Sequence, residues 1–300
     1  MTMASGRPAA SHVASSASRA AEPAERTAEV TWFDARGVTL GPADLAVLDA
    51  RESARAAAFV FPADQHRYQV AHVMLRRVLA GHLGAEPGRL TFARQHCPTC
   101  GGPSGKPVLA GPPAVLAWGG DPPGTPRGAD GAWPASRQAP SRMTTEDERP
   151  VLSFSLAHSG EAVAIAVAAR PVGIDVERDA TGCVCSLVPA MHPDDAASVA
   201  VLPEAERHLA VIRWWVRAEA VLKCAGSGIA HGMDAFPMLG APVRRRVPPG
   251  PRLPWEPDVP GWAAAAGYSF AGLSAPRGYQ AALALPGLRM IRYRWEPGGR

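Results

Sequence analysis

Residues 162–177 have the sequence AVAIAVAARPVGIDVE. Two short apolar runs, Ala162–Ala168 and Val172–Glu177, flank an Ala-Arg-Pro turn, and this pattern predicts an antiparallel hairpin. Alternate side chains of a strand share one face. Ile174 and Val176 are therefore expected in the core, and Asp175 and Glu177 are expected to project together from the opposite face.

Further strands and helices are predicted on both sides of this hairpin. Apolar runs predict strands at residues 30–33, 152–156, 279–285 and 288–295. Helical patterns predict helices at residues 42–49, 64–83 and 203–225, with glycines closing the last two. Helices and strands are mixed in both halves of the chain, so the predicted fold class is α+β.

The composition also predicts how the chain is divided. Residues 1–28 are poor in large apolar side chains and are expected to form a disordered tail. Residues 119–150, dominated by Gly, Pro, Ala and charged residues, are expected to be a flexible insertion or linker. The two remaining segments are an N-terminal half, 29–118, and a C-terminal half, 151–300, which carries the acidic pair.

Composition and charge exclude several classes of function. A hydrophobic fraction of 47% suits a globular core, and the absence of a long apolar run argues against a membrane span. The net charge of +4 suits an anionic ligand or an acidic partner but is too small to indicate nucleic acid. Five cysteines, an odd number without an export signal, favour a reducing cytoplasm.

Asp175 and Glu177 are the first candidates for chemistry. Two carboxylates on one face of a strand repel each other unless a cation lies between them, and hard oxygen ligands suit Mg²⁺ or Mn²⁺. A half-exposed strand with a solvated acidic face is the alternative explanation, and this motif alone does not decide between them.

A second motif lies in the predicted helix at 203–225. Trp215, Glu219 and Lys223 are four residues apart and form one stripe, so Glu219 could complete a site of three carboxylates. Lys223 would then place an ammonium near phosphate. The simpler alternative is an ordinary Glu–Lys surface pair, which stabilises a helix by about 0.2–0.5 kcal/mol.

Two shorter motifs complete the set. His158 and Ser159 end the run Phe154–Ser159, where an imidazole, a hydroxyl and backbone N–H groups can bind phosphate; a merely solvated loop histidine is the alternative. The turn Gly105-Lys106-Pro107 holds one of only two lysines among 31 basic residues, and Lys223 is the other. A compact ammonium retained where Arg is the usual cation is a candidate for a specific role.

In order and spacing, these motifs resemble those of the 4′-phosphopantetheinyl transferase superfamily, of the surfactin-synthetase-activating type. The matching segments are Gly105–Pro107, Phe154–Ser159, Val172–Glu177 and Trp215–Lys223. Both lysines fall within them. Arg51, Arg55, Phe59, His66-Arg67 and Leu75-Arg76 are similar to the family's basic helical region.

The resemblance implies an activity, a fold and partners. The activity is transfer of 4′-phosphopantetheine from coenzyme A to a serine of a carrier protein, with release of adenosine 3′,5′-bisphosphate. The implied fold is a pseudo-twofold pair of similar halves with coenzyme A in the cleft between them. The implied chain is a monomer that binds acidic carrier-protein helices. A relative that binds coenzyme A or a carrier without transfer, and a Mg²⁺-dependent phosphohydrolase, are the rival readings.

The resemblance also implies a role for each matching residue. The metal ligands would be Asp175, Glu177 and Glu219, with Glu219 also the base for the serine proton and Lys223 the cation at the pyrophosphate. The residues expected to hold the coenzyme are Arg51, Arg55, Arg67, Lys106, Pro107, His158 and Ser159.

Two positions depart from the pattern, and one cysteine motif stands outside it. Ala157 replaces the serine that usually precedes the motif histidine, and Ala218 replaces the lysine that usually precedes the helix glutamate, which puts the grip on the coenzyme in doubt. Cys97-Pro-Thr-Cys100 is half of a zinc site, whereas Cys183-Val-Cys185 has the wrong spacing for the other half. An exposed dithiol or an inert turn is therefore also open.

Overall fold

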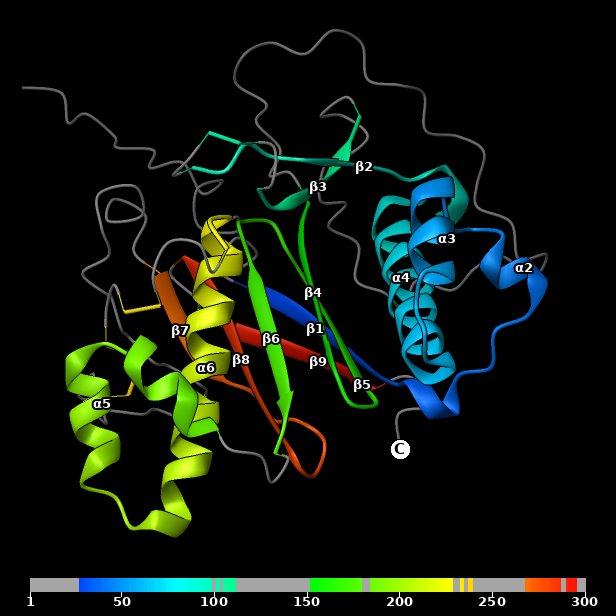
Figure 1. The fold of residues 1–300 in the computed structure, drawn as a ribbon. Helices are drawn as coiled ribbons and strands as arrows, with labels where there is room; N and C mark the ends of the chain where they lie inside the picture. Colours follow the sequence, from blue (N-terminus) through cyan, green and yellow to red (C-terminus); the bar gives the residue numbers. More distant parts are fainter. Residues whose placement is uncertain are drawn as a thin grey trace, which may run out of the picture.

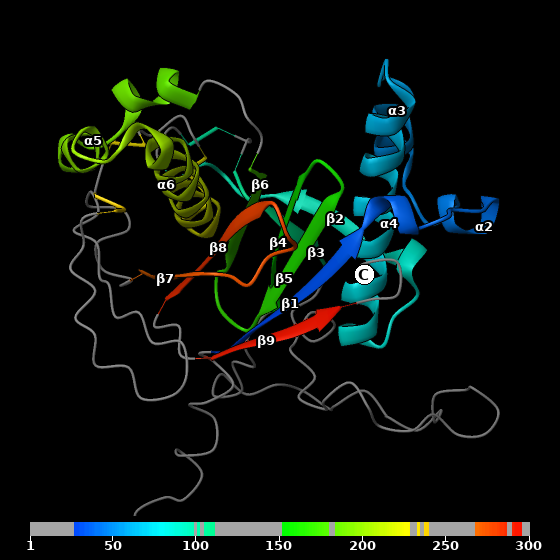
Figure 2. The same cartoon turned by 90° about the horizontal axis from the view of Figure 1, so that it is seen from below.

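The computed structural model describes residues 27–98, 101–102, 105–111, 152–179, 184–228, 233–234, 237–239, 268–286 and 290–295. These residues form four layers (Figures 1 and 2): helix α4, a four-stranded sheet, a three-stranded sheet and helix α6. The mixed α+β class predicted from the sequence is confirmed. Within the described part of the chain, no helix is long and apolar enough to cross a membrane.

The strands belong to three sheets. The four-stranded sheet has the order β4-β5-β1-β9, with β1 Thr27–Asp34, β4 Ser153–Ser159, β5 Ala162–Ala168 and β9 Met290–Trp295. The three-stranded sheet has the order β6-β8-β7, with β6 Gly173–Arg178, β7 Tyr268–Gly272 and β8 Tyr279–Pro286. A separate two-stranded sheet pairs β2 Thr91–Arg94 with β3 Pro107–Ala110.

The three predicted helices are present, one of them shortened, and α3 and α5 were not predicted. The α-helices are α2 Pro42–Leu45, α3 Ala50–Ala57, α4 Pro62–Leu83, α5 Pro193–Ala200 and α6 Glu204–Ala225; short 3-10 turns are η1 Ala35–Gly37, η2 Pro87–Arg89 and η3 Val184–Ala190. The predicted helices at 64–83 and 203–225 are thus confirmed. The helix predicted at 42–49 covers only its first four residues.

Glycines end both long helices in the left-handed conformation. Gly84 closes α4 with φ 61° and Gly226 closes α6 with φ 82°. An L side chain would be strained at these angles, so glycine is favoured where the last helical carbonyls must still be satisfied.

Strand β5 shows why the layers form. Val163, Ile165 and Val167 pack against α4, whereas the alanines between them face the second sheet. Alternate residues of a strand point to opposite faces, and both faces are buried here. The small alanine face lets the two sheets pack closely around Trp32 and Leu283.

The predicted hairpin of 162–168 with 172–177 is wrong. Both segments are strands, but β5 pairs antiparallel with β1 and β4, whereas β6 pairs antiparallel with β8 in the other sheet. The tight turn instead lies between β4 and β5 at Gly160, whose φ is 52°. Ala-Arg-Pro is the crossover between two stacked sheets, because each strand has a buried apolar face for a different layer.

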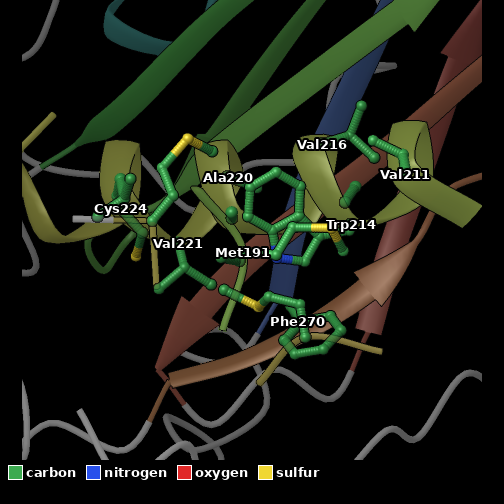
Figure 3. Packing of buried hydrophobic residues seen from close by; sticks show 14 of the residues in the cluster. Met191, Val211, Trp214, Val216, Ala220, Val221, Cys224 and Phe270 are labelled. Atoms are coloured by element: carbon green, nitrogen blue, oxygen red, sulfur yellow. The ribbon is translucent and has the colours of Figure 1, made fainter. Parts of the chain in front are cut away.

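Helix α6 covers the outer face of the three-stranded sheet. Figure 3 shows Trp214 and Val221 of α6 with Phe270 of β7 in one apolar cluster. Strand β6 comes closest to the helix at Gly173, where an added Cβ would lie 1.9 Å from the carbonyl oxygen of Ala220. Only glycine permits this approach, and it brings the acidic face of β6 directly against α6.

Three predictions on segments fall outside the described residues or at their edge. The tail was predicted to residue 28, and the described chain begins at Thr27 as the first residue of β1. Most of the predicted tail, the predicted insertion at 119–150 and the remainder of the N-terminal half after residue 111 lie outside the described residues.

Candidate functional site

Three of the four predicted motifs meet at one pocket between β4, β6 and α6, and the turn Gly105–Pro107 does not line it. It has a volume of about 330 Å³ and is lined by Leu156, Ala157, His158, Asp175, Glu177, Trp215, Glu219 and Lys223. The alternation of β6 points its two carboxylates toward α6, and the four-residue stripe of α6 points toward β6. The sequence thus correctly placed the carboxylates and the lysine on facing surfaces.

Asp175 is the most strongly perturbed group of the pocket. Its Oδ1 accepts a hydrogen bond from the Lys223 ammonium at 2.6 Å, while its Oδ2 is buried and has no hydrogen-bond partner among the described residues. Burial raises the pKa of Asp175 to about 7, although Lys223 opposes the rise, and the nearby charges of Glu219 and Glu177 add to it. This carboxylate is therefore under-compensated for its negative charge.

Glu219 and Glu177 provide the other acidic side chains. Burial raises the pKa of Glu219, with Lys223 lowering it and Glu177 raising it further. Glu177 Oε2 accepts a hydrogen bond from Ser159 Oγ at 2.7 Å, and Ser159 Oγ in turn accepts one from the backbone N–H of Arg178 at 3.1 Å. Ser159 is thus engaged in orienting a predicted metal ligand and does not line the pocket.

His158 lines the pocket, and its predicted contact with the coenzyme stays a prediction. Burial lowers its pKa, and the positive charges of Arg67 and Lys223 lower it further. Arg67 itself bonds to Asp64 and donates to the carbonyl oxygen of Gly160 at 2.9 Å. Arg67 therefore fixes the β4–β5 turn that carries His158, and its charge adds to the effect of burial in lowering the pKa of the imidazole.

The other predicted coenzyme contacts lie outside the pocket lining. Lys106 donates to Val172 O at 2.5 Å and to Ser153 Oγ at 3.2 Å, and burial lowers its pKa. Pro107 is exposed at the start of β3. Arg51 and Arg55 are exposed on α3, with the Arg55 guanidinium 5.2 Å from the ring centre of Phe59. The roles assigned to these four residues remain predictions.

The carboxylates fit a hard divalent cation only after a rearrangement. As the side chains stand, the described residues contain no group of three or more His, Cys, Asp or Glu arranged to hold a metal ion. Lys223 covers one oxygen of Asp175 and Ser159 covers one of Glu177. The unpartnered Oδ2 of Asp175 and an all-oxygen donor set nevertheless suit Mg²⁺.

The zinc question falls partly outside the described residues. Cys97 is buried, and its Sγ lies 3.8 Å from the carbonyl oxygen of Ser227, to which the thiol donates. Cys100 lies outside the described residues, so a site that uses both thiols stays a prediction.

Comparison with known proteins supports the resemblance seen in the motifs. Residues 171–283 match the family described as the 4′-phosphopantetheinyl transferase superfamily. This segment carries β6 and α6, with all three predicted metal ligands and Lys223. The predicted resemblance to the superfamily is therefore confirmed, whereas the surfactin-synthetase-activating type stays a prediction.

One curated relative is similar over a larger part of the chain. It is 4′-phosphopantetheinyl transferase HetI of Nostoc sp. strain PCC 7120, which is 30% identical over 188 residues. The aligned part spans 62% of this chain and 62% of the relative.

Sequence reasoning did not assign a site role to two walls of the pocket. Leu156 on β4 and Trp215 on α6 line it beside the charged groups. Trp215 was noticed as the first member of the stripe with Glu219 and Lys223, and that spacing was the available signal. Leu156 gave no signal beyond its place in the motif, because an apolar strand residue more often belongs to the core.

Proposed function

We propose that this chain transfers 4′-phosphopantetheine from coenzyme A to a serine hydroxyl of an acyl or peptidyl carrier protein. The observation that carries the proposal is the pocket in which Asp175, Glu219 and Lys223 converge with His158, within a chain whose residues 171–283 match the superfamily. An under-compensated carboxylate that faces a cation is typical of sites that bind a further charged group.

In the proposed reaction, the serine oxygen forms a bond to the β-phosphorus of coenzyme A. The bond from that phosphorus to the bridging pyrophosphate oxygen breaks, and adenosine 3′,5′-bisphosphate leaves. The serine proton goes to Glu219, since the raised pKa of this carboxyl makes it a better base than an ordinary glutamate.

Asp175, Glu177 and Glu219 would hold Mg²⁺, with Mn²⁺ as an alternative. When bound, the ion supplies positive charge to the pyrophosphate and to the leaving oxygen. Lys223 contributes a second positive charge at the pyrophosphate. His158 donates a hydrogen bond from its ring N–H to a phosphate oxygen. The cations Arg51, Arg55, Arg67 and Lys106, which lie outside the pocket lining, would contribute to holding the nucleotide end.

The proposal extends to the surroundings of the site. We propose that the pseudo-twofold halves form the coenzyme cleft, that the chain acts as a monomer in the cytoplasm, and that its carriers belong to secondary-metabolite synthases. The net charge of +4 supports docking of an acidic carrier helix.

The test is the intact mass of a purified apo carrier protein after incubation with this protein, coenzyme A and Mg²⁺. We expect the carrier to gain one phosphopantetheine on its serine, and we expect that gain to be lost with EDTA and in Glu219→Gln and Asp175→Ala. Glu206→Gln, in the first turn of the same helix, is the matched control and should retain activity. Coenzyme A binding without any gain across several carrier types would favour the binding-only relative. Failure to bind coenzyme A would overturn the proposal.

A further inference from the structure

Lys223 and Asp175 form an ion pair between a fixed anion and a movable cation. Nζ lies 2.6 Å from Oδ1, and the side chain of Asp175 is only 7% exposed whereas that of Lys223 is 31% exposed. The lysine ammonium stands on a flexible stem with three rotatable donors. It can therefore leave the carboxylate without a movement of α6.

The charges of the pocket are not balanced by this pair. Three carboxylates, those of Asp175, Glu177 and Glu219, line the pocket with one ammonium, that of Lys223. The second oxygen of Asp175 is buried and has no hydrogen-bond partner among the described residues. A single ammonium thus covers one oxygen of the buried carboxylate and leaves the other without compensation.

We infer that Lys223 is a resident counter-ion that gives up its place on Asp175 when a divalent cation binds. A dication brings two charges to the carboxylates where the ammonium brings one, so the exchange also compensates the uncovered oxygen of Asp175. The released ammonium then faces the open pocket, where an anionic ligand binds. That this ligand is the coenzyme's pyrophosphate rests on the proposed function; the exchange itself does not require transfer.

This arrangement orders the events at the site. Before the metal binds, the Lys223 ammonium is paired with Asp175 and does not bind an incoming phosphate. After the metal binds, both the metal and the ammonium are directed at the phosphate. Lys223 would therefore couple metal binding to coenzyme binding, because the two ligands share one cation.

The two lysines of the chain make the exchange directly observable. Lysine labelled with ¹⁵N at Nζ should give two ammonium signals by NMR, and Lys223→Arg assigns them by removing one. We expect Mg²⁺ alone to shift the Lys223 signal and to speed its exchange with water. Lys106, held by Val172 O and Ser153 Oγ, is the internal control and should not respond. A Lys223 signal unchanged at saturating Mg²⁺, or no saturable Mg²⁺ binding, overturns the inference.

Calorimetry with Lys223→Met gives a second, opposite-signed test. At a pH well above 7, where Asp175 is ionised, Mg²⁺ should bind roughly tenfold tighter without its competitor, at the lower end of what one opposite charge does to a neighbouring carboxylate. Coenzyme A should bind more weakly to the same variant. Arg213→Met removes one positive charge from the same helix, where Arg213 donates to Gln280 at 3.1 Å, and should change neither affinity. Unchanged or weaker Mg²⁺ binding by Lys223→Met contradicts the exchange.

The inference and the proposed function can fail separately. A carrier that gains mass while the Lys223 signal ignores Mg²⁺ supports transfer and rejects the exchange. A Lys223 signal that responds to Mg²⁺ in a protein that modifies no carrier supports the exchange and rejects transfer.

Discussion

Among the described residues, the charged cluster around Arg76 and that around Asp175 are both buried, and they differ in how fully their charges are compensated. Arg76 of α4 is fully buried, and its guanidinium donates to Glu52, to Asp49 and to the carbonyl oxygens of Pro87 and Leu90. In the pocket, by contrast, Asp175 has one bonded oxygen and one buried oxygen without a hydrogen-bond partner among the described residues.

The pKa values shift in opposite directions in the two clusters. Burial acts to raise the pKa of Glu52, but the hydrogen bonds from His72 and from the Asp49 N–H, with the charge of Arg76, lower it overall. Burial raises the pKa of Asp175 to about 7 in spite of Lys223. The first cluster is structural: the ion pairs of Arg76 with Asp49 and Glu52 hold α3 against α4. The second leaves the charge of Asp175 only partly compensated, as is typical of a site where a further cation binds.

The largest effect on stability is expected from breaking the compensated cluster. Arg76→Met leaves the carboxylate of Glu52 buried without its cation, so the free energy of unfolding should fall by about 3–5 kcal/mol. Urea denaturation monitored by circular dichroism measures this change.

The neighbouring residue provides the matched control. Arg77 also pairs with a carboxylate, that of Asp44, but on the surface of the same helix. Arg77→Met should cost far less than Arg76→Met, because exposed ion pairs contribute little to stability. Equal losses in the two variants would mean that burial of Arg76 contributes nothing and that the contrast between the clusters is wrong.

An intermediate effect of opposite sign is expected in the pocket. In EDTA at pH 8, Asp175→Asn removes a buried charge that Lys223 only partly compensates, so the free energy of unfolding should rise by on the order of 1 kcal/mol. Transfer should be lost in the same variant. Chemical denaturation and the carrier mass assay measure the two effects side by side.

Asp195 is the control for that substitution. Its carboxylate is fully buried and accepts hydrogen bonds at 2.6 Å from the backbone N–H groups of Met238 and Leu239. Asp195→Asn turns one acceptor into a donor against a backbone N–H and should destabilise by about 1–3 kcal/mol. If Asp175→Asn destabilised as much as Asp195→Asn, the pocket carboxylate would be a structural group.

The sequence predicted elements better than it predicted their partners. The strand at 162–168 was predicted with its observed bounds, because its pattern is local. Its pairing was wrong, because the choice between β6 and β1 depends on which layer covers each face. The close approach of Gly173 to Ala220 likewise depends on tertiary packing and not on local sequence. The motif contains this glycine, but a glycine in a strand does not reveal what lies above it.

The site divides in the same way. The carboxylate pair and the helical stripe were predictable, because strand and helix periodicity place each set on one face. The engagement of Ser159 with Glu177 and of Lys106 with Val172 was not predicted. Residues 106 and 172 are brought together only by folding, so no local pattern marks the contact.

The smallest effect concerns the acid side of the compensated cluster. Because the folded-state pKa of Glu52 is lowered from its ordinary 4.5, its ionised form contributes stability that is fully present above pH 4.5. This contribution is lost as the pH falls through the folded-state pKa. The slope cannot exceed about 1.4 kcal/mol per pH unit, the limit for one titrating group.

Glu52→Gln removes this titration and provides the reference curve. The difference in free energy of unfolding between the wild type and Glu52→Gln should be constant above about pH 5.5, one unit above the ordinary pKa, and should shrink as the pH falls. Urea denaturation from pH 3 to 7 measures it. A difference that grows on acidification would mean that burial raises the folded-state pKa of Glu52, as it does that of Asp175. The two clusters would then be alike, and a partly compensated carboxylate would no longer distinguish the functional pocket from the structural cluster around Arg76.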